Sequence, residues 1–160
     1  MNLTPSAETA LQAALANERY SEVFYAAVET WANDHAFPGL EGWARGEAIE
    51  EVAHTRAVAE YLNTRSSARL DALDAAPDLP DDYAGVLRAL LGFMAVVTAG
   101  YTALADASAD ASDYATLMLA QKFLDLQRLA EHHIEIYLMR VERGASIDLL
   151  DSELYEDANG

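Results

Sequence analysis

Glu51 and His54 form the most chemically distinctive pair in this sequence, a carboxylate and an imidazole at positions i and i+3. On a helix, side chains with this spacing lie on one face, so the two groups would stand side by side. Oxygen and nitrogen ligands together suit iron, zinc or manganese. Because a single Glu-x-x-His pair often occurs by chance, its meaning depends on the elements around it.

Glu18 lies on the apolar stripe of the preceding predicted helix, just as Glu51 and His54 lie on the apolar stripe of theirs. Glu18 and the Glu51–His54 pair are each about halfway along their helices, so the three side chains are expected to meet in the middle of a bundle. Burying two carboxylates with one histidine costs on the order of several kcal/mol, and a bound metal removes that cost. The pattern favours a metal site and leaves open a buried Glu–His ion pair or a solvated helix face.

Hydrophobic side chains that recur at steps of three and four predict four long helices and a short fifth helix. The predicted ranges are residues 7–34, 39–63, 81–108, 113–143 and 147–154. Pro38 separates the first two helices. Residues 64–80 contain Ser66, Ser67, Pro77 and Pro80 and show no clear period, so they predict an extended connection. Asp81 or Asp82 is expected to cap the third helix, and Gly144 to stop the fourth.

The lengths of the connections predict the topology. Short links make the first and second helices antiparallel, and likewise the third and fourth. The long connection can return the chain along the bundle, which makes the second and third helices parallel. The sequence therefore predicts an all-α four-helix bundle with one long crossover, formed by residues 1–160 as a single domain.

The chain has 27 acidic residues against 10 Lys plus Arg, a net charge of −17, and Lys122 is its only lysine. Such a surface repels nucleic acids and anionic membranes, because both bind positive side chains. Neither is therefore expected as a partner. The acidity fits solubility or adaptation to salt, and it also fits the steering of cations toward the protein.

Several other classes of protein are excluded by the composition. Without cysteine there is no disulfide, thiolate metal site or cysteine nucleophile. No run of about 18 uncharged apolar residues is present, so no membrane span is expected. Residues 1–10 lack the basic and apolar regions of a secretory signal. A soluble, cytoplasmic protein is expected.

Five segments together resemble a bacterial ferritin over about residues 11–156, and the combination is far more specific than any one of them. The segments are residues 17–25, 50–54, 113–114, 121–127 and 144–153. The resemblance implies a ferritin-like four-helix bundle with a short fifth C-terminal helix. It also implies that copies of the chain form a 24-subunit hollow shell that stores ferric mineral.

The resemblance implies roles for individual residues. Glu18, Glu51 and His54 would form the first iron position of a ferroxidase centre, which binds Fe²⁺ and Fe³⁺. Tyr25 matches the tyrosine beside that centre, and Gln127 matches its glutamine. Neither is assigned a firm catalytic role.

The sequence departs from the family where a second iron would bind. Ferritin-like di-iron sites take a Glu from each of two helices and a Glu-x-x-His from each of the other two. Met94 replaces the glutamate expected on the third helix, and Leu126, Leu129 and Ala130 stand where bacterial ferritins carry acids on the fourth. Val52 replaces the haem-ligating methionine of bacterioferritins, so haem is not expected. Half of a dinuclear site is present.

Three further glutamates are candidate metal ligands. Glu50 matches an acid that some bacterial ferritins use for a third iron. Glu22 and Glu47 each lie one turn from a predicted ligand, so they could complete a site built by the first two helices alone. The alternative for both is a solvated acid on an inner surface.

Two functions remain open at this point. The first is an iron-binding and iron-storage cage subunit with weak or incomplete ferroxidase activity. The second is a catalytically inactive subunit that co-assembles with another ferritin, which the replacements at Met94, Leu126 and Ala130 favour. A di-metal oxidase is the weakest reading because it needs the missing ligands, and the acidic charge argues against a DNA-coating protein.

Overall fold

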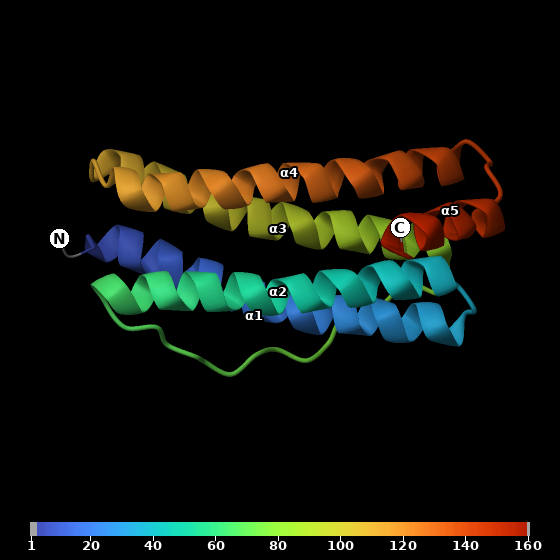
Figure 1. Ribbon diagram of the computed structural model, residues 1–160, viewed down its shortest axis with the longest axis horizontal. Helices are drawn as coiled ribbons and strands as arrows, with labels where there is room; N and C mark the ends of the chain where they lie inside the picture. Colours follow the sequence, from blue (N-terminus) through green and yellow to red (C-terminus); the bar gives the residue numbers. More distant parts are fainter. Residues whose placement is uncertain (1–2, 160) are drawn as a thin grey trace.

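The computed structural model describes residues 3–159, and its helices pack side by side along one long axis (Figure 1). They are α1 (Pro5–Asp34), α2 (Pro38–Arg65), α3 (Tyr83–Asp110), α4 (Tyr114–Glu142) and α5 (Ile147–Asn159). The bounds of the first four lie within two residues of the predicted ones. α5 continues beyond the predicted end at residue 154, because residues 155–159 contain neither Pro nor Gly to stop it.

Local sequence explains where the helices begin and end. The Thr4 hydroxyl accepts the backbone N–H of Ala7 at the start of α1, at 3.3 Å. Of the two predicted caps of α3, Asp82 is the one used, and its carboxylate accepts the N–H of Gly85 at 2.8 Å. Gly144 follows α4 with φ of 84°, a left-handed conformation that favours glycine at a helix end.

The bundle is made of two antiparallel hairpins, α1–α2 and α3–α4 (Figure 1). Residues 66–82 cross over from the end of α2 to the start of α3, which makes α2 and α3 parallel and confirms the predicted all-α topology. The crossover lies along α1 and is held there by hydrogen bonds from three side chains. These bonds join Gln12 to Ser67 and Arg69, Arg19 to Asp71, and Tyr20 to Ala75.

Two hydrophobic clusters fill the interior, one toward each end of the bundle. Members of the first include Phe24, Val28, Leu40, Ala44, Leu90, Met94 and Ile134. Members of the second include Leu11, Leu15, Val58, Leu62, Tyr101, Leu104 and Phe123. Glu18 on α1 and Glu51 on α2 fall between the two clusters along their helices, and both are buried. The core is therefore interrupted by charged side chains at its middle.

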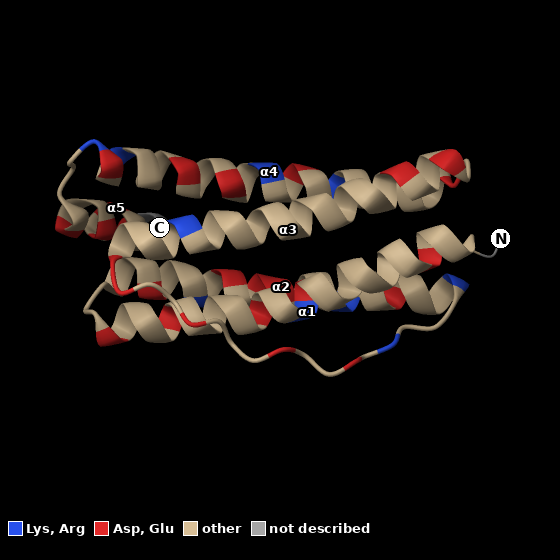
Figure 2. Cartoon of the chain, turned by 180° about the vertical axis from the view of Figure 1, so that it is seen from behind, with Lys and Arg blue, Asp and Glu red and all other residues tan. Residues whose placement is uncertain are grey.

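α3 is the most apolar helix of the bundle, and few of its residues are charged (Figure 2). Within residues 3–159 it is the one helix long and apolar enough to cross a membrane, with a mean hydropathy of 1.6 over its most apolar stretch. This criterion of length and composition is looser than the uncharged run considered in the sequence, because it allows charged residues such as Arg88 and Asp106. A core helix of a soluble protein has the same character, and Leu87, Leu90 and Leu104 of α3 are fully buried in the bundle.

α5 is attached to the start of α2 by a buried carboxylate. Asp151 is 4% exposed, and its Oδ2 and Oδ1 accept the backbone N–H groups of Gly39 and Leu40 at 2.8 and 2.9 Å. Phe37, the N-cap residue of α2, makes no side-chain cap, so Asp151 satisfies these groups from another helix. Gly39 permits the close approach, since a Cβ there would lie 1.8 Å from the backbone oxygen of Asp151.

We expect Asp151→Ala to lower the free energy of unfolding by about 1–3 kcal/mol, because two buried N–H groups lose their acceptor. Urea denaturation followed by circular dichroism measures this change. Ser152→Ala is the matched control, because Ser152 is exposed and its hydroxyl donates to the carbonyl of Asp148 within α5. Equal effects of the two substitutions would contradict a capping role for Asp151.

Candidate metal centre

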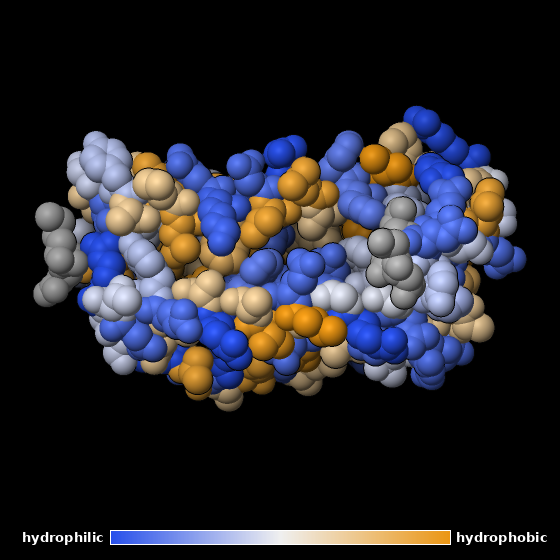
Figure 3. All heavy atoms as spheres, in the orientation of Figure 1, coloured by the Kyte–Doolittle hydropathy of each residue, from blue (hydrophilic) through white to orange (hydrophobic). Residues whose placement is uncertain are grey.

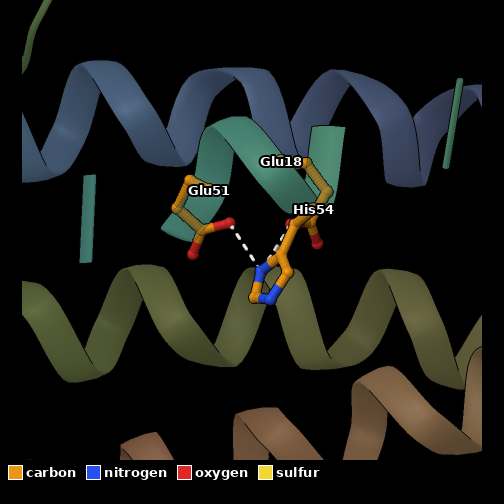
Figure 4. A group of neighbouring side chains, drawn as sticks. All are labelled: Glu18, Glu51 and His54. Carbon is orange, nitrogen blue, oxygen red and sulfur yellow. Dashed lines mark hydrogen bonds and ion pairs between the residues drawn. The ribbon is translucent and has the colours of Figure 1, made fainter. Parts of the chain in front are cut away.

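Glu18, Glu51 and His54 converge in the middle of the bundle, as the sequence predicts (Figure 4). Glu18 comes from α1, whereas Glu51 and His54 stand one turn apart on α2. One potential ligand atom from each residue lies within 4.8 Å of the others. We call these three residues the Glu–Glu–His cluster.

Short contacts hold the cluster together. His54 Nδ1 lies 3.2 Å from Glu51 Oε2 and 3.4 Å from Glu18 Oε2. The hydroxyl of Tyr101 on α3 donates a hydrogen bond of 2.5 Å to Glu18 Oε1. Among the residues that the structure describes, none makes a hydrogen bond to the fully buried Glu18 Oε2. The ion-pair contact of this oxygen is therefore the longer one to His54, which a bound cation could replace.

The cluster balances its charge by holding protons. Burial alone would raise the pKa of Glu18, but His54, Glu51 and Tyr101 together lower that pKa. Burial, reinforced by Glu18, raises the pKa of Glu51 to about 8. Contacts with Glu18 and Glu51 raise the pKa of His54 to about 10. Near neutral pH the metal-free cluster therefore contains a carboxylate, a carboxylic acid and an imidazolium, with no net charge.

Aromatic rings form one wall of the cluster and fix the histidine. The edge of the His54 ring meets the Phe123 ring, with centroids 5.2 Å apart and an interplanar angle of 85°. Phe123 in turn stacks on Tyr101 at 4.7 Å. α4 thus orients the imidazole through Phe123, and α3 binds Glu18 through Tyr101.

A pocket of about 250 Å³ lies beside the cluster and is lined by residues of α1, α2 and α4. We call it the α2–α4 pocket. Glu51 and His54 of the cluster line this pocket. Four residues that the sequence predicts near the centre also line it: Tyr25, Glu47, Glu50 and Gln127. Tyr25 and Gln127 are buried, Glu47 is half-buried and Glu50 is exposed. Burial raises the pKa of Glu47 to about 7, and the charge of Glu50 adds to the shift.

Glu22 is the predicted candidate that the structure does not bring to the centre. Its side chain is exposed, and it lines a different surface depression together with Ala76 of the crossover. The buried stripe of α1 continues from Glu18 through Ser21 to Tyr25, a step of three followed by a step of four. Glu22 lies on the other edge of the Glu18 face, toward the crossover, so the structure does not bring its side chain to the cluster.

The positions of the missing ligands are apolar in the structure as well. Met94 is 1% exposed and packs in the first hydrophobic cluster. Leu126, Leu129 and Ala130 line the α2–α4 pocket without offering an oxygen or nitrogen ligand. Val52 is exposed at 41% on the surface of α2.

Sequence reasoning missed the roles of two residues. The sequence pattern of α3 does not indicate that the Tyr101 hydroxyl bonds to Glu18. Of the adjacent histidines on α4, His132 is exposed, whereas His133 lines the α2–α4 pocket with a buried Nε2. The sequence indicates only that two neighbouring histidines must face in different directions.

The cluster has the chemistry of a metal site. Two carboxylates and an imidazole are a ligand set for a divalent transition metal such as iron. Glu18 Oε2 lies 3.4 Å from His54 Nδ1, and a cation can replace the two protons that keep the cluster neutral. The residues therefore fit the metal that the sequence predicts.

Comparisons with known proteins agree with this fold. The family described as Ferritin, Ferritin-like domain, matches residues 8–144. No curated protein matches in sequence. Two crystal structures of an open pore ferritin from the hyperthermophilic archaeon Archaeoglobus fulgidus are similar, each with 19% identity and a TM-score of 0.90. The alignments cover 96% and 97% of this chain and 98% of each archaeal chain. At this identity, the similarity shows the fold.

We expect the affinity of the metal-free protein for Zn²⁺ to increase between about pH 5.5 and 7.5. Throughout this range Glu51 and His54 hold protons, since their pKa values are raised to about 8 and about 10. A metal must displace those protons, so affinity should rise about tenfold per pH unit for each one displaced. Calorimetric titration at several pH values measures the slope, which should be shallower in His54→Gln. An affinity independent of pH would contradict this charge assignment.

Proposed function

Because the chain belongs to the ferritin-like domain family, we propose that it binds and stores iron as a subunit of a protein cage. The observation that carries the proposal is the convergence of Glu18, Glu51 and His54 in the centre of the bundle. Without a metal, protons on Glu51 and His54 offset the charge of the buried carboxylates. Fe²⁺ supplies positive charge in their place and accepts both oxygen and nitrogen ligands.

The chain's own residues bind the incoming Fe²⁺ and give up protons. Glu18 is already ionised, and Tyr101 holds it in place through its hydroxyl. Glu51 and His54 release their protons as the metal binds. Oxidation to Fe³⁺ removes one electron from each iron, and dissolved oxygen is the acceptor.

Ferroxidase activity is proposed to be weak. Reduction of oxygen to peroxide takes two electrons and two Fe²⁺ ions, whereas the cluster offers a single firm iron position. Met94 and Ala130 supply no ligand for a second iron in the family's arrangement. Oxidation would then depend on successive encounters of iron with the site.

Assembly into a shell of copies of this chain is part of the proposal, with the 24-subunit arrangement implied by the resemblance. Several large apolar side chains are exposed on the isolated chain, and contacts between copies in a shell would cover some of them. The most exposed are Ile49, Leu70, Val96, Tyr114, Met118, Leu129 and Leu149. The cytoplasm is the proposed location, where the net charge of −17 would attract Fe²⁺ to the shell.

The alternative is a subunit without ferroxidase activity that co-assembles with a second ferritin. The burial of Met94 in a hydrophobic cluster favours it, because a second iron position cannot be restored there by a change of rotamer. Such a subunit would contribute binding sites to the shell, and a partner subunit would carry out the oxidation.

We expect the wild-type protein to oxidise Fe²⁺ slowly in air and retain the ferric product. Glu18→Gln and His54→Ala should each reduce the initial rate by about tenfold or more, because each removes a direct ligand. Ferric absorbance after addition of Fe²⁺ measures the rate. Glu22→Gln is the matched control, since Glu22 lies one turn from Glu18 but is exposed outside the cluster. Identical rates in the wild type and the three variants would contradict the assignment of the cluster as the iron site.

The co-assembling alternative makes a different prediction. The protein alone would then bind Fe²⁺ without oxidising it above the buffer rate, and shells reassembled with a catalytically active ferritin would oxidise it. Reassembly from mixed dissociated subunits, followed by the same absorbance measurement, tests this. A slow but cluster-dependent rate in the homogeneous shell would reject the alternative.

A further inference from the structure

Tyr101 reaches the Glu–Glu–His cluster from the opposite hairpin and bonds to one oxygen of a cluster carboxylate. It lies on α3, whereas Glu18 lies on α1, and its hydroxyl is 2.5 Å from Glu18 Oε1. Hydrogen bonds from a hydroxyl to an ionised carboxylate are shorter and stronger than those between neutral groups. The oxygen Oε1 is therefore engaged by the protein before any cation arrives.

The other oxygen of Glu18 faces the remaining members of the cluster. Glu18 Oε2 is buried and lies 3.4 Å from His54 Nδ1, and that nitrogen lies 3.2 Å from Glu51 Oε2. Figure 4 shows both contacts as dashed lines that meet at the imidazole. The two oxygens of Glu18 thus have different surroundings, because Oε1 is bonded to α3 and Oε2 lies beside the other two ligands.

Packing fixes the ring that carries the hydroxyl. Tyr101 is 1% exposed and stacks on Phe123, with an interplanar angle of 2° and centroids 4.7 Å apart. Phe123 is itself held against the edge of the His54 ring. Tyr101 also belongs to the second hydrophobic cluster, where the side chains of Leu15 and Val58 offer no competing acceptor. The hydroxyl therefore stays at Glu18 Oε1 when the charge of the cluster changes.

The bond to Tyr101 limits how Glu18 can bind a metal. To bind through both oxygens, the carboxylate would have to rotate and leave a buried hydroxyl without an acceptor. With Oε1 engaged, the cluster offers Glu18 Oε2, the carboxylate of Glu51 and one nitrogen of His54. Zn²⁺, Fe²⁺ and Co²⁺ accept small sets of mixed oxygen and nitrogen ligands. Ca²⁺ and Mn²⁺ prefer oxygen ligands, and Ca²⁺ in particular takes many of them.

We propose that Tyr101 sets the cation selectivity of the cluster by holding Glu18 Oε1, so that Glu18 binds a metal through Oε2 alone. Tyr101 is a positioning residue in this role, because it acts on the cation through Glu18. The proposal deepens the proposed function and rests on it, since it takes the cluster as the metal site. α3, whose Met94 supplies no ligand, thereby still contributes to the choice of metal.

Tyr101→Phe tests the proposal, because it removes the hydroxyl and keeps the ring that stacks on Phe123. Crystals of the full-length wild type and variant are soaked in equal concentrations of Zn²⁺ and Mn²⁺. Hydrophilic residues cover much of the face in Figure 3, and the net charge is −17, so cations will also bind at the surface. Anomalous differences at the two absorption edges give the occupancy of each metal at the cluster itself.

We expect the ratio of Zn²⁺ to Mn²⁺ at the cluster to fall by about tenfold in Tyr101→Phe. Glu18 should contact the metal through one oxygen in the wild type and through both oxygens in the variant. If Tyr101 serves stability alone, the melting temperature falls while the ratio and the contact stay unchanged, and the proposal is overturned.

Tyr61→Phe is the matched control, because it removes another tyrosine hydroxyl that joins two helices. The Tyr61 hydroxyl lies 2.8 Å from that of Thr116 on α4, and neither residue belongs to the cluster. This variant should keep the wild-type ratio of Zn²⁺ to Mn²⁺. An equal fall of the ratio in both variants would contradict a specific role for Tyr101.

The wild-type crystal tests the proposal even if Tyr101→Phe folds poorly. Glu18 bound through both oxygens there, or an Oε1 that has moved away from Tyr101, would overturn it. Wild-type crystals with no metal at the cluster would overturn the iron assignment together with this proposal. Metal at the cluster with the same Zn²⁺ to Mn²⁺ ratio in wild type and Tyr101→Phe would overturn this proposal alone.

Discussion

The burial of two carboxylates and one imidazole in the centre of a hydrophobic bundle is the constraint on which the other features depend. Glu18 and Glu51 are 0% and 3% exposed, and they separate two apolar clusters that would otherwise form one continuous core. The metal-free cluster remains neutral only because Glu51 and His54 hold protons, as the raised pKa of each indicates. Stability, metal affinity and pH response are therefore coupled through the same protons.

The two hairpins contribute differently to this centre. α1 and α2 supply all the charged groups of the cluster, whereas α3 and α4 supply the Tyr101 hydroxyl and the Phe123 ring that orient them. The family resemblance implies a glutamate at position 94 of α3, but Met94 stands there and packs in the hydrophobic core. The polar groups that α4 does present, Gln127 and His133, face the α2–α4 pocket.

The sequence predicts the helices well because each stripe of apolar residues is long, and proline, glycine and aspartate mark their ends. It also predicts the cluster, since Glu18, Glu51 and His54 lie in phase with those stripes. Glu22 was misplaced because steps of three and four are both helical, and only packing against a neighbour chooses between Ser21 and Glu22. The role of His133 depends on how α4 sits against α2, a tertiary relation that no single-helix pattern contains.

The position of the crossover affects the order in which parts of the chain can fold. Glu18, Glu51 and His54 all precede residue 66, so the cluster forms within a single αα-hairpin closed by a short link. Short loops close at a low entropic cost, and contacts near in sequence form early. The first hairpin can thus gather its ligands before α3 arrives to cover them. A chain nicked between residues 66 and 82 would likewise keep the whole cluster on one fragment, whereas the two walls of the α2–α4 pocket would be separated.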